Sequence, residues 1–133
     1  MIAGGADTHA ALRYLLKNPL LSNAARSFID DAGAAGHEIL LSPISLAEIV
    51  YLIEKNRLPA SVYTELKQAL IDHEYVIEEA PLTAEIVEAM RLVPRDAVPD
   101  LPDRLVAATA VYFGVPVLSR DARMRASSVR TVW

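Results

Sequence analysis

The sequence predicts an α/β protein, a three-layer α/β/α sandwich around a mainly parallel central sheet. Short and almost wholly apolar segments alternate with longer segments of helical period along the whole chain. Strands that are apolar on both faces and separated by helices are typical of a parallel sheet covered on both sides. The chain has 133 residues and no linker or repeat that would divide it. This length is close to that of an average domain, so we expect a single domain over residues 1–133.

The expected strands share a short apolar run that is bounded by turn-forming residues. They cover residues 1–6, 38–41, 75–78, 115–119 and 129–133. The first of them is the weakest prediction, because Gly4 and Gly5 dilute its apolar character.

The expected helices share a period near 3.6 residues, and most follow a serine, threonine or aspartate that can cap them. They cover residues 8–16, 22–35, 43–55, 60–72, 83–91, 103–113 and 122–126. The helix over residues 103–113 is apolar on nearly every side, so we expect it to be buried. Residues 94–102 contain three prolines, which exclude a regular element there.

The composition excludes several classes of protein. The chain has no cysteine, which excludes a disulfide scaffold, a thiolate zinc site and a cysteine nucleophile. No uncharged apolar run approaches the ~20 residues that span a bilayer. The first six residues lack the basic start and apolar middle of a signal peptide. We therefore expect a cytoplasmic protein without a membrane contact.

The net charge of −4 argues at first against a nucleic-acid partner. The charges are unevenly distributed, however. Residues 1–90 carry 13 acidic and 6 basic side chains, whereas residues 91–133 carry 4 acidic and 7 basic ones. The C-terminal third is therefore positive, and arginine, which supplies most of the basic residues, binds phosphate and carboxylate oxygens equally well.

Four acidic residues fall at places that a parallel sheet brings together. Asp7 follows the first expected strand, Asp121 follows the fourth, Asp103 opens the buried helix, and Glu48 lies in the helix after the second strand. Sites in such sheets form beyond the carboxyl ends of the strands. Clustered carboxylates repel one another, and a hard dication such as Mg²⁺ or Mn²⁺ relieves that repulsion. Taken singly, each aspartate is better explained as a helix cap, and Glu48 as a solvated residue.

The orientation of Glu48 follows from the period of its helix. Leu46, Ile49, Val50 and Ile53 form the apolar stripe that we expect to face the core. At ~100° per residue, Glu48 points roughly away from that stripe. It is therefore free to face a cleft.

The segments around these acids resemble the PIN-domain nucleases, and the toxins of VapBC-type toxin–antitoxin pairs most of all. The matching segments are Asp7–Thr8–His9–Ala10, residues 42–49, residues 103–110 and Leu118–Ser119–Arg120–Asp121. The resemblance implies a metal-dependent endoribonuclease that hydrolyses RNA phosphodiester bonds at a four-carboxylate Mg²⁺ or Mn²⁺ site. It also implies a cognate antitoxin as partner, and a homodimer or a toxin–antitoxin hetero-oligomer. The chain departs from the family in its glycine-containing first strand and in Arg13, where related toxins often have an aromatic residue.

The resemblance assigns the catalytic metal site to Asp7, Glu48, Asp103 and Asp121. By this hypothesis Asp7 and Asp103 are the main ligands, Asp121 completes the site directly or through water, and Glu48 holds a water or a second ion.

Further residues are candidates for supporting roles. The hydroxyls of Thr8 and Ser119 could orient the carboxylates, or serve as ordinary turn and cap groups. Asp100 is either an auxiliary acid or the cap of the buried helix. The candidates for binding the RNA backbone are Arg104, Arg120, Arg123 and Arg125, whose alternatives are pairing with nearby acids and plain solvation. The three histidines, His9, His37 and His73, have no metal-like spacing and are expected at the surface or at caps.

Two other functions stay open at this point. One is a PIN nuclease of RNA processing that has no antitoxin, and the other is a degenerate PIN fold that only binds RNA or protein. A group of apolar residues also has two explanations: a groove for an antitoxin segment or a dimer face, or burial under the helix over residues 60–72. These residues are Leu12, Leu15, Leu16, Tyr51 and Leu52.

Overall fold

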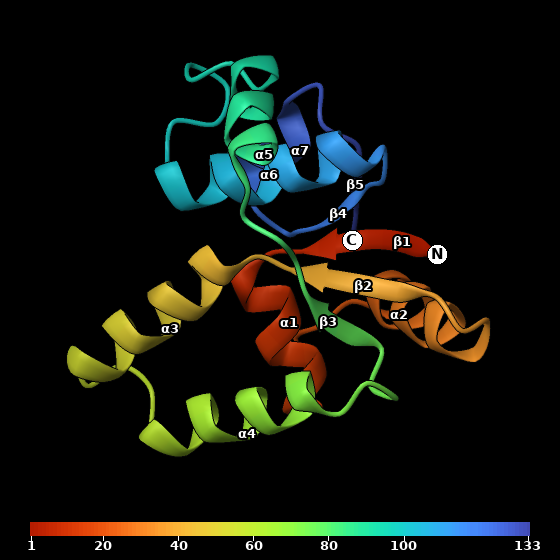
Figure 1. Cartoon of the computed structure of the whole chain (residues 1–133). Helices are drawn as coiled ribbons and strands as arrows, with labels where there is room; N and C mark the ends of the chain where they lie inside the picture. The colour runs from red at the N-terminus through yellow and green to blue at the C-terminus, as the bar shows by residue number, and fades with distance from the viewer.

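The centre of the molecule is a sheet of five parallel strands (Figure 1). The computed structural model describes residues 1–133. The strands are β1 (Ile2–Ala6), β2 (Glu38–Leu41), β3 (Ile77–Glu79), β4 (Val117–Leu118) and β5 (Thr131–Val132). They lie in the order β3-β2-β1-β4-β5, and every pairing is parallel. The predicted parallel α/β fold is confirmed.

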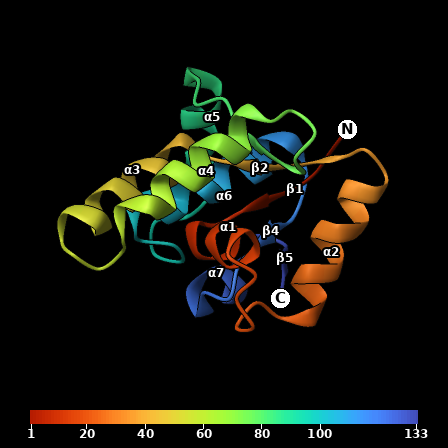
Figure 2. The same ribbon diagram turned by 90° about the horizontal axis from the view of Figure 1, so that it is seen from below.

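Helices cover both faces of this sheet, as Figures 1 and 2 show. They are α1 (Thr8–Leu15), α2 (Asn23–Ala34), α3 (Pro43–Glu54), α4 (Ala60–Ile71), α5 (Ala84–Ala89), the 3₁₀ helix η1 (Met90–Leu92), α6 (Leu101–Phe113) and α7 (Ala122–Ala126). One face is covered by α1, α2 and α4, and the other by α5, α6 and α7. None of these helices is long and apolar enough to cross a membrane.

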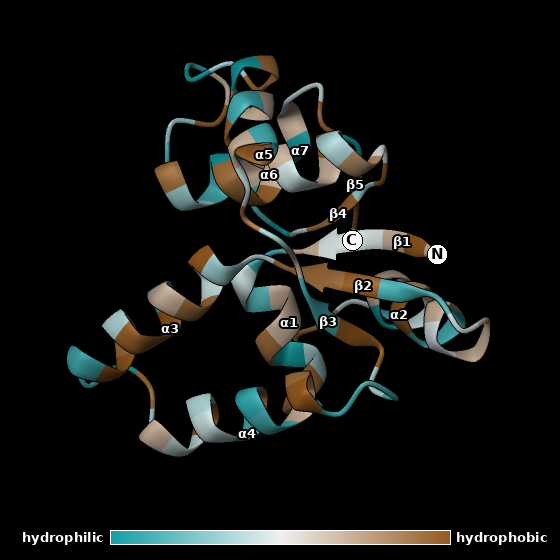
Figure 3. Ribbon diagram, viewed as in Figure 1, coloured by the Kyte–Doolittle hydropathy of each residue, from teal (hydrophilic) through white to brown (hydrophobic).

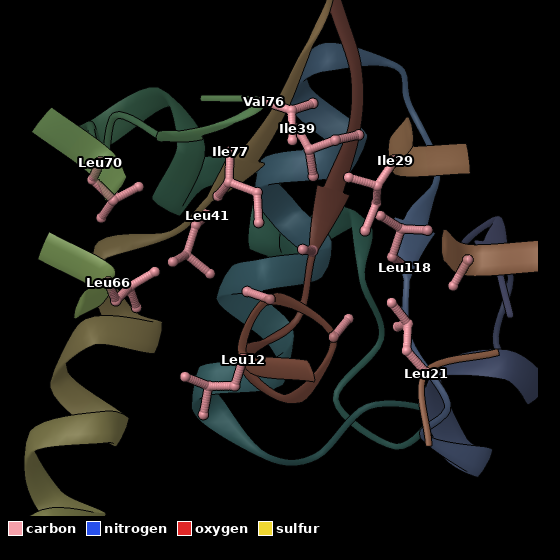
Figure 4. Close-up of a cluster of buried hydrophobic side chains, with 14 of the residues drawn as sticks. Leu12, Leu21, Ile29, Ile39, Leu41, Leu66, Leu70, Val76, Ile77 and Leu118 are labelled. Carbon is pink, nitrogen blue, oxygen red and sulfur yellow. The ribbon is translucent and has the colours of Figure 1, made fainter. Parts of the chain in front are cut away.

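The larger part of the core lies between the sheet and the α1, α2 and α4 layer (Figure 4). Ile39 and Leu41 of β2 meet Ile29 and Leu66 there, and all four side chains are fully buried. In Figure 3 most of β2 is brown, and brown and teal residues alternate along the helices, as expected of helices with one apolar face. On the other face, residues 105–110 of α6 are all buried, which confirms the prediction of a buried helix.

Several element boundaries differ from the prediction. The third strand begins at Ile77 instead of Tyr75, because the residues before it form a turn. The helix that was expected to begin at Asp103 begins at Leu101, and its cap is Asp100, whose Oδ2 accepts a hydrogen bond from the Asp103 N–H (3.3 Å). Pro102 fits the first turn, where no backbone donor is needed.

The expected core stripe of α3 is partly wrong. Val50 is 38% exposed, and the fully buried positions on this helix are Ser45 and Ile49. The reason is that α3 packs on both α1 and α6 at the margin of the sheet instead of lying flat on one of its faces.

The two glycines of β1 have different structural roles. A Cβ atom on Gly4 would lie 3.0 Å from Cε1 of Phe28 and 3.2 Å from the carbonyl oxygen of Pro116. A Cβ atom on Gly5 would meet nothing closer than 3.7 Å. Gly4 therefore permits the close approach of β1 to its neighbours, whereas Gly5 does not.

We predict opposite effects of alanine at these two positions. Gly4→Ala is expected to lower the free energy of unfolding by ~1–3 kcal/mol, because the new methyl group overpacks the sheet. Gly5→Ala is the matched control and is expected to be neutral or to stabilise by up to ~1 kcal/mol. Urea unfolding followed by circular dichroism measures both. Equal effects of the two substitutions would contradict this explanation.

Candidate carboxylate site

The two central neighbouring strands, β1 and β4, end at the same edge of the sheet and carry the first residues of the site. The Asp7 N–H donates to the carbonyl of Leu118 (3.1 Å), so Asp7 lies directly beside the end of β4. Ser119 and then Asp121 follow β4 at that edge. A helix begins two residues after β1 ends and four residues after β4 ends, and it turns the chain away and leaves these side chains at the carboxyl edge.

A small polar cavity of about 160 Å³ opens at this edge. None of its lining residues is hydrophobic. They are Asp7, Thr8, His9, Glu48, Asp100, Asp103 and Asp121. The structure therefore brings together all four acids singled out in the sequence, with Thr8 and Asp100.

Three of these aspartates cap helices and line the cavity at the same time: Asp100, described above, Asp7 and Asp121. Oδ1 of Asp7 accepts a hydrogen bond from the Ala10 N–H (2.8 Å), and Oδ1 of Asp121 accepts one from the Met124 N–H (2.9 Å). Asp7 is only 7% exposed, whereas Asp121 is exposed. Each cap uses one oxygen of its carboxylate, which leaves the other oxygen available to a ligand.

Two buried hydroxyls hold the carboxylates in place. Thr8 Oγ1 donates to Oε1 of Glu48 (2.7 Å), which joins α1 to α3 across the cavity. The Ser119 hydroxyl donates to the Asp7 carboxylate and its oxygen accepts from the Asp121 N–H (3.0 Å). Thr8 and Ser119 thus contact three of the four acids through the groups that the sequence analysis named.

The electrostatics of the cavity are dominated by crowded negative charge. The pKa of Asp103 is raised to about 7, first by burial and then by the charges of four neighbours, Asp100, Asp121, Glu48 and Asp7. Burial also raises the pKa of Asp7, although the hydrogen bonds from Ser119 and Ala10 act in the opposite direction. A cation in the cavity would stabilise the ionised forms of both groups.

The ligand atoms of this cavity are chiefly carboxylate oxygens, which hard divalent cations such as Mg²⁺ and Mn²⁺ prefer. In the structure, no group of three or more acidic or histidine side chains is placed so that it could hold a metal ion. Mg²⁺ commonly binds through one or two carboxylates and keeps several waters. The donor set therefore fits such an ion, with Asp7 as the most buried of the four acids and Glu48 and Asp103 half-buried.

The four arginines predicted to bind RNA lie in different surroundings. The Arg104 guanidinium donates to the backbone carbonyls of Val93 (3.2 Å) and Met90 (2.8 Å), which ties the start of α6 to η1 and the residue that follows it. Arg120, Arg123 and Arg125 are exposed after β4 and on α7.

Three residues that the sequence analysis did not assign to the site also lie beside it. His9 lines the carboxylate cavity, and Arg13 and Trp133 line a neighbouring cavity together with Asp7 and Asp121. The placement of His9 two residues after Asp7 was a signal in the sequence. No pattern in the sequence predicts that Arg13 and Trp133, which lie at opposite ends of the chain, line the same cavity.

A third cavity, of about 450 Å³, bears on the apolar residues for which the sequence left two explanations, a groove or burial under the helix over residues 60–72. It is lined by Leu12, Tyr51 and Leu52 beside Glu48, and Tyr51 is 55% exposed. A groove therefore exists on this face, and α4 does not bury Tyr51. Leu15 and Leu16 are not part of it.

Comparison with known proteins gives a consistent result. A family model described as "PIN domain" matches residues 6–128. Ribonuclease VapC22 of Mycobacterium tuberculosis is 28% identical over 120 residues, which cover 90% of this chain and 87% of that protein. A crystal structure of VapBC2 from Rickettsia felis, bound to a DNA fragment from its promoter, superimposes with a TM-score of 0.71 at 15% identity, covering 98% of this chain and 97% of that one. The similarity to this crystal structure shows that the two chains share a fold.

Proposed function

The chain belongs to the PIN-domain family, and we propose that it is a metal-dependent endoribonuclease that acts as the toxin of a toxin–antitoxin pair. The observation that carries the proposal is the convergence of Asp7, Glu48, Asp103 and Asp121 on one cavity with no hydrophobic lining residue. The ribonuclease name of the similar mycobacterial protein supports the reaction. The structural neighbour was solved as a VapBC assembly, which supports an antitoxin as partner.

In this proposal Asp7 and Asp103 hold a Mg²⁺ or Mn²⁺ ion, and Asp121 and Glu48 complete its surroundings. The ion supplies neutralisation of the phosphate charge and a source of hydroxide near neutral pH. Ser119 fixes the Asp7 carboxylate, and Thr8 fixes that of Glu48. These hydrogen bonds set the direction in which each carboxylate presents its oxygens to the cavity.

The proposed partners are RNA, a cognate antitoxin, and a second copy of the chain in a homodimer or a toxin–antitoxin hetero-oligomer. The groove along Leu12, Tyr51 and Leu52 is the place where we expect an apolar antitoxin segment to bind. Because Glu48 lies at the end of this groove, a basic antitoxin residue there could reach the carboxylates and compete with the metal.

The decisive experiment incubates the purified protein with total cellular RNA in Mg²⁺, in Mn²⁺ and in EDTA, and maps the new ends. We expect cleavage only with the metals, with 5′-phosphate and 3′-hydroxyl products from in-line attack. Asp7→Asn should be inactive while its melting temperature stays at or above that of the wild type, since asparagine can still cap α1. Cleavage that persists in EDTA, or a fully active Asp7→Asn protein, would overturn the proposed mechanism.

Induced expression separates the toxin from the alternatives. A toxin stops growth, and co-expression of a small neighbouring gene relieves the arrest. Cleavage without growth arrest would favour an RNA-processing nuclease. RNA binding without cleavage in any metal would favour a degenerate binding domain.

A prediction about Thr8 tests the positioning of Glu48. Thr8→Val keeps the volume of the side chain and removes the donor to Glu48, so we expect kcat to fall ~10–100-fold with little change in KM. Thr8→Ser keeps the hydroxyl and should restore most of the activity. Circular dichroism melts of both variants control for folding. A Thr8→Val protein as active as Thr8→Ser would show that this hydrogen bond is not needed.

A further inference from the structure

A second cavity of about 370 Å³ adjoins the carboxylate site. It lies between α1, the loop from β4 to α7, and the end of β5, which Figure 2 shows gathered at one side of the molecule. Asp7, His9 and Asp121 line both cavities, so the two lie side by side. A polymer that reaches the carboxylates therefore has a place for a neighbouring unit here.

Arg13 is the unusual residue of this cavity. It lies one helical turn beyond His9 on α1, and its guanidinium carbon is 5.8 Å from the centre of the Trp133 ring. Its Nη1 atom is buried and has no hydrogen-bond acceptor in the protein. Arg13 also takes part in neither of the two ion pairs of the structure, His73–Glu78 and Arg91–Glu88.

An arginine in this situation has unused binding capacity. The guanidinium has five N–H donors in a rigid plane, and leaving a buried donor without an acceptor is costly. The Trp133 ring attracts the guanidinium through its π face without using those donors. A planar donor group of this kind matches the two oxygens of a phosphate.

We propose that this cavity binds a phosphate of the RNA strand next to the bond that is cut, with Arg13 as its main ligand and Arg120 at the exposed side. The inference rests on the proposed function, because it names a subsite of the same substrate. Arg120 directly precedes Asp121 in the chain, and both line this cavity with Arg13. The phosphate subsite therefore lies next to the carboxylates.

Negative groups in the cavity restrict where the phosphate can lie. Asp7 and Asp121 form the wall that is shared with the carboxylate site, and they repel an anion there. The remaining wall is formed by Arg13, Arg120 and Trp133, with Ala122. A phosphate is therefore expected at the arginine end, and its neighbour along the strand at the carboxylate end. A carboxylate from a protein partner is the competing occupant, but it gives no reason for the cavity to share Asp7, His9 and Asp121 with the carboxylate site.

The first test measures RNA binding in the Asp103→Asn background, in which cleavage is expected to be lost. The probe is a short single-stranded RNA of mixed sequence with a fluorescent label, followed by anisotropy in Mg²⁺ over a series of salt concentrations. Adding Arg13→Met should weaken binding ~10-fold and reduce the slope of log Kd against log salt by ~0.7, the value of one phosphate contact. Arg91→Met is the matched control, because Arg91 lies on η1, outside both cavities, and should change neither quantity.

A second measurement does not depend on substitutions at Arg13. Trp133 is the only tryptophan of the chain, so its fluorescence reports directly on this cavity. In the Asp103→Asn protein we expect a saturable change of the Trp133 fluorescence on titration with the RNA. Sodium phosphate should give a smaller change than the RNA, and sodium chloride at equal ionic strength the smallest change.

The outcomes distinguish a failure of the proposed phosphate subsite from a failure of the proposed endoribonuclease function. If wild-type protein cleaves RNA but Arg13→Met binds it with unchanged Kd and salt slope, the subsite is wrong and the proposed function stands. If the RNA binds to neither protein and is not cleaved, both are overturned. If an acidic peptide changes the Trp133 fluorescence and the RNA does not, the cavity serves a protein carboxylate and the RNA subsite is overturned.

Discussion

Asp103→Asn is expected to remove most RNA cleavage and, in the same molecule, to raise the melting temperature of the metal-free protein. Loss of a metal ligand forfeits several kcal/mol of transition-state stabilisation, which corresponds to a ~10²–10³-fold fall in kcat/KM. The gain in stability has a separate cause: burial first, and crowding by other acids second, penalise the ionised form of Asp103 in the folded protein. Asparagine keeps the size of the side chain and removes that charge.

The pH dependence of this effect follows from the direction of the pKa shift. The pKa of Asp103 is 3.8 in an unfolded chain and is raised to about 7 in the folded protein. The folded state therefore binds more protons between these values, and the free energy of unfolding falls as the pH rises from about 4 to about 7. Below this range Asp103 is neutral in both states and the penalty is absent. The variant should thus gain over the wild type only as the pH rises.

The measurement is a series of thermal melts in EDTA, between pH 4 and pH 8, beside a cleavage assay in Mg²⁺. Because Asp103 is partly exposed, solvent screening reduces the gain to ~1 kcal/mol, or a few °C at pH 8. Asp96→Asn is the matched control, since Asp96 is exposed in the proline-rich segment and lines no described cavity. A stability gain that is the same at pH 4 and pH 8 would contradict this account, as would full activity.

Leu41→Ala is expected to cause the largest loss of stability among the variants considered. Leu41 is the last residue of β2, fully buried between the sheet and the helical layer that contains Leu66 (Figure 4). Truncating a buried leucine removes transfer free energy and leaves a cavity, so the free energy of unfolding should fall by ~3–4 kcal/mol. That is a large share of the ~5–15 kcal/mol that stabilises a typical domain.

The control for Leu41→Ala is Ile71→Ala at the end of α4, where the side chain is 63% exposed. An exposed apolar residue contributes little, so this variant should stay within ~0.5 kcal/mol of the wild type. Urea unfolding curves give both values. A loss at Leu41 of less than ~1 kcal/mol would mean that the core relaxes around the cavity, and would contradict the packing described for β2.

The caps and the carboxyl ends of the strands were predictable because they depend on neighbours in the chain. Asp7 comes directly after an apolar run and directly before a helical period, so its place at a strand end and its role as a cap are both local properties. The same reasoning held for Asp121. For α6 the predicted start, Asp103, is two residues too late. Asp100 and Asp103 could each cap this helix, and the prolines before it give no periodic pattern from which to choose between them.

The order of the elements, the parallel sheet and the gathering of four acids near its carboxyl edge could be predicted from the sequence. The hydrogen bond from Thr8 to Glu48, those from Arg104 to backbone carbonyls, and the position of Arg13 over Trp133 became known only from the folded chain. The physical reason is range. Periodicity and capping involve residues within about one helical turn, whereas these contacts join segments that are brought together by the packing of α1, α3, α6 and the last strand around a single sheet edge.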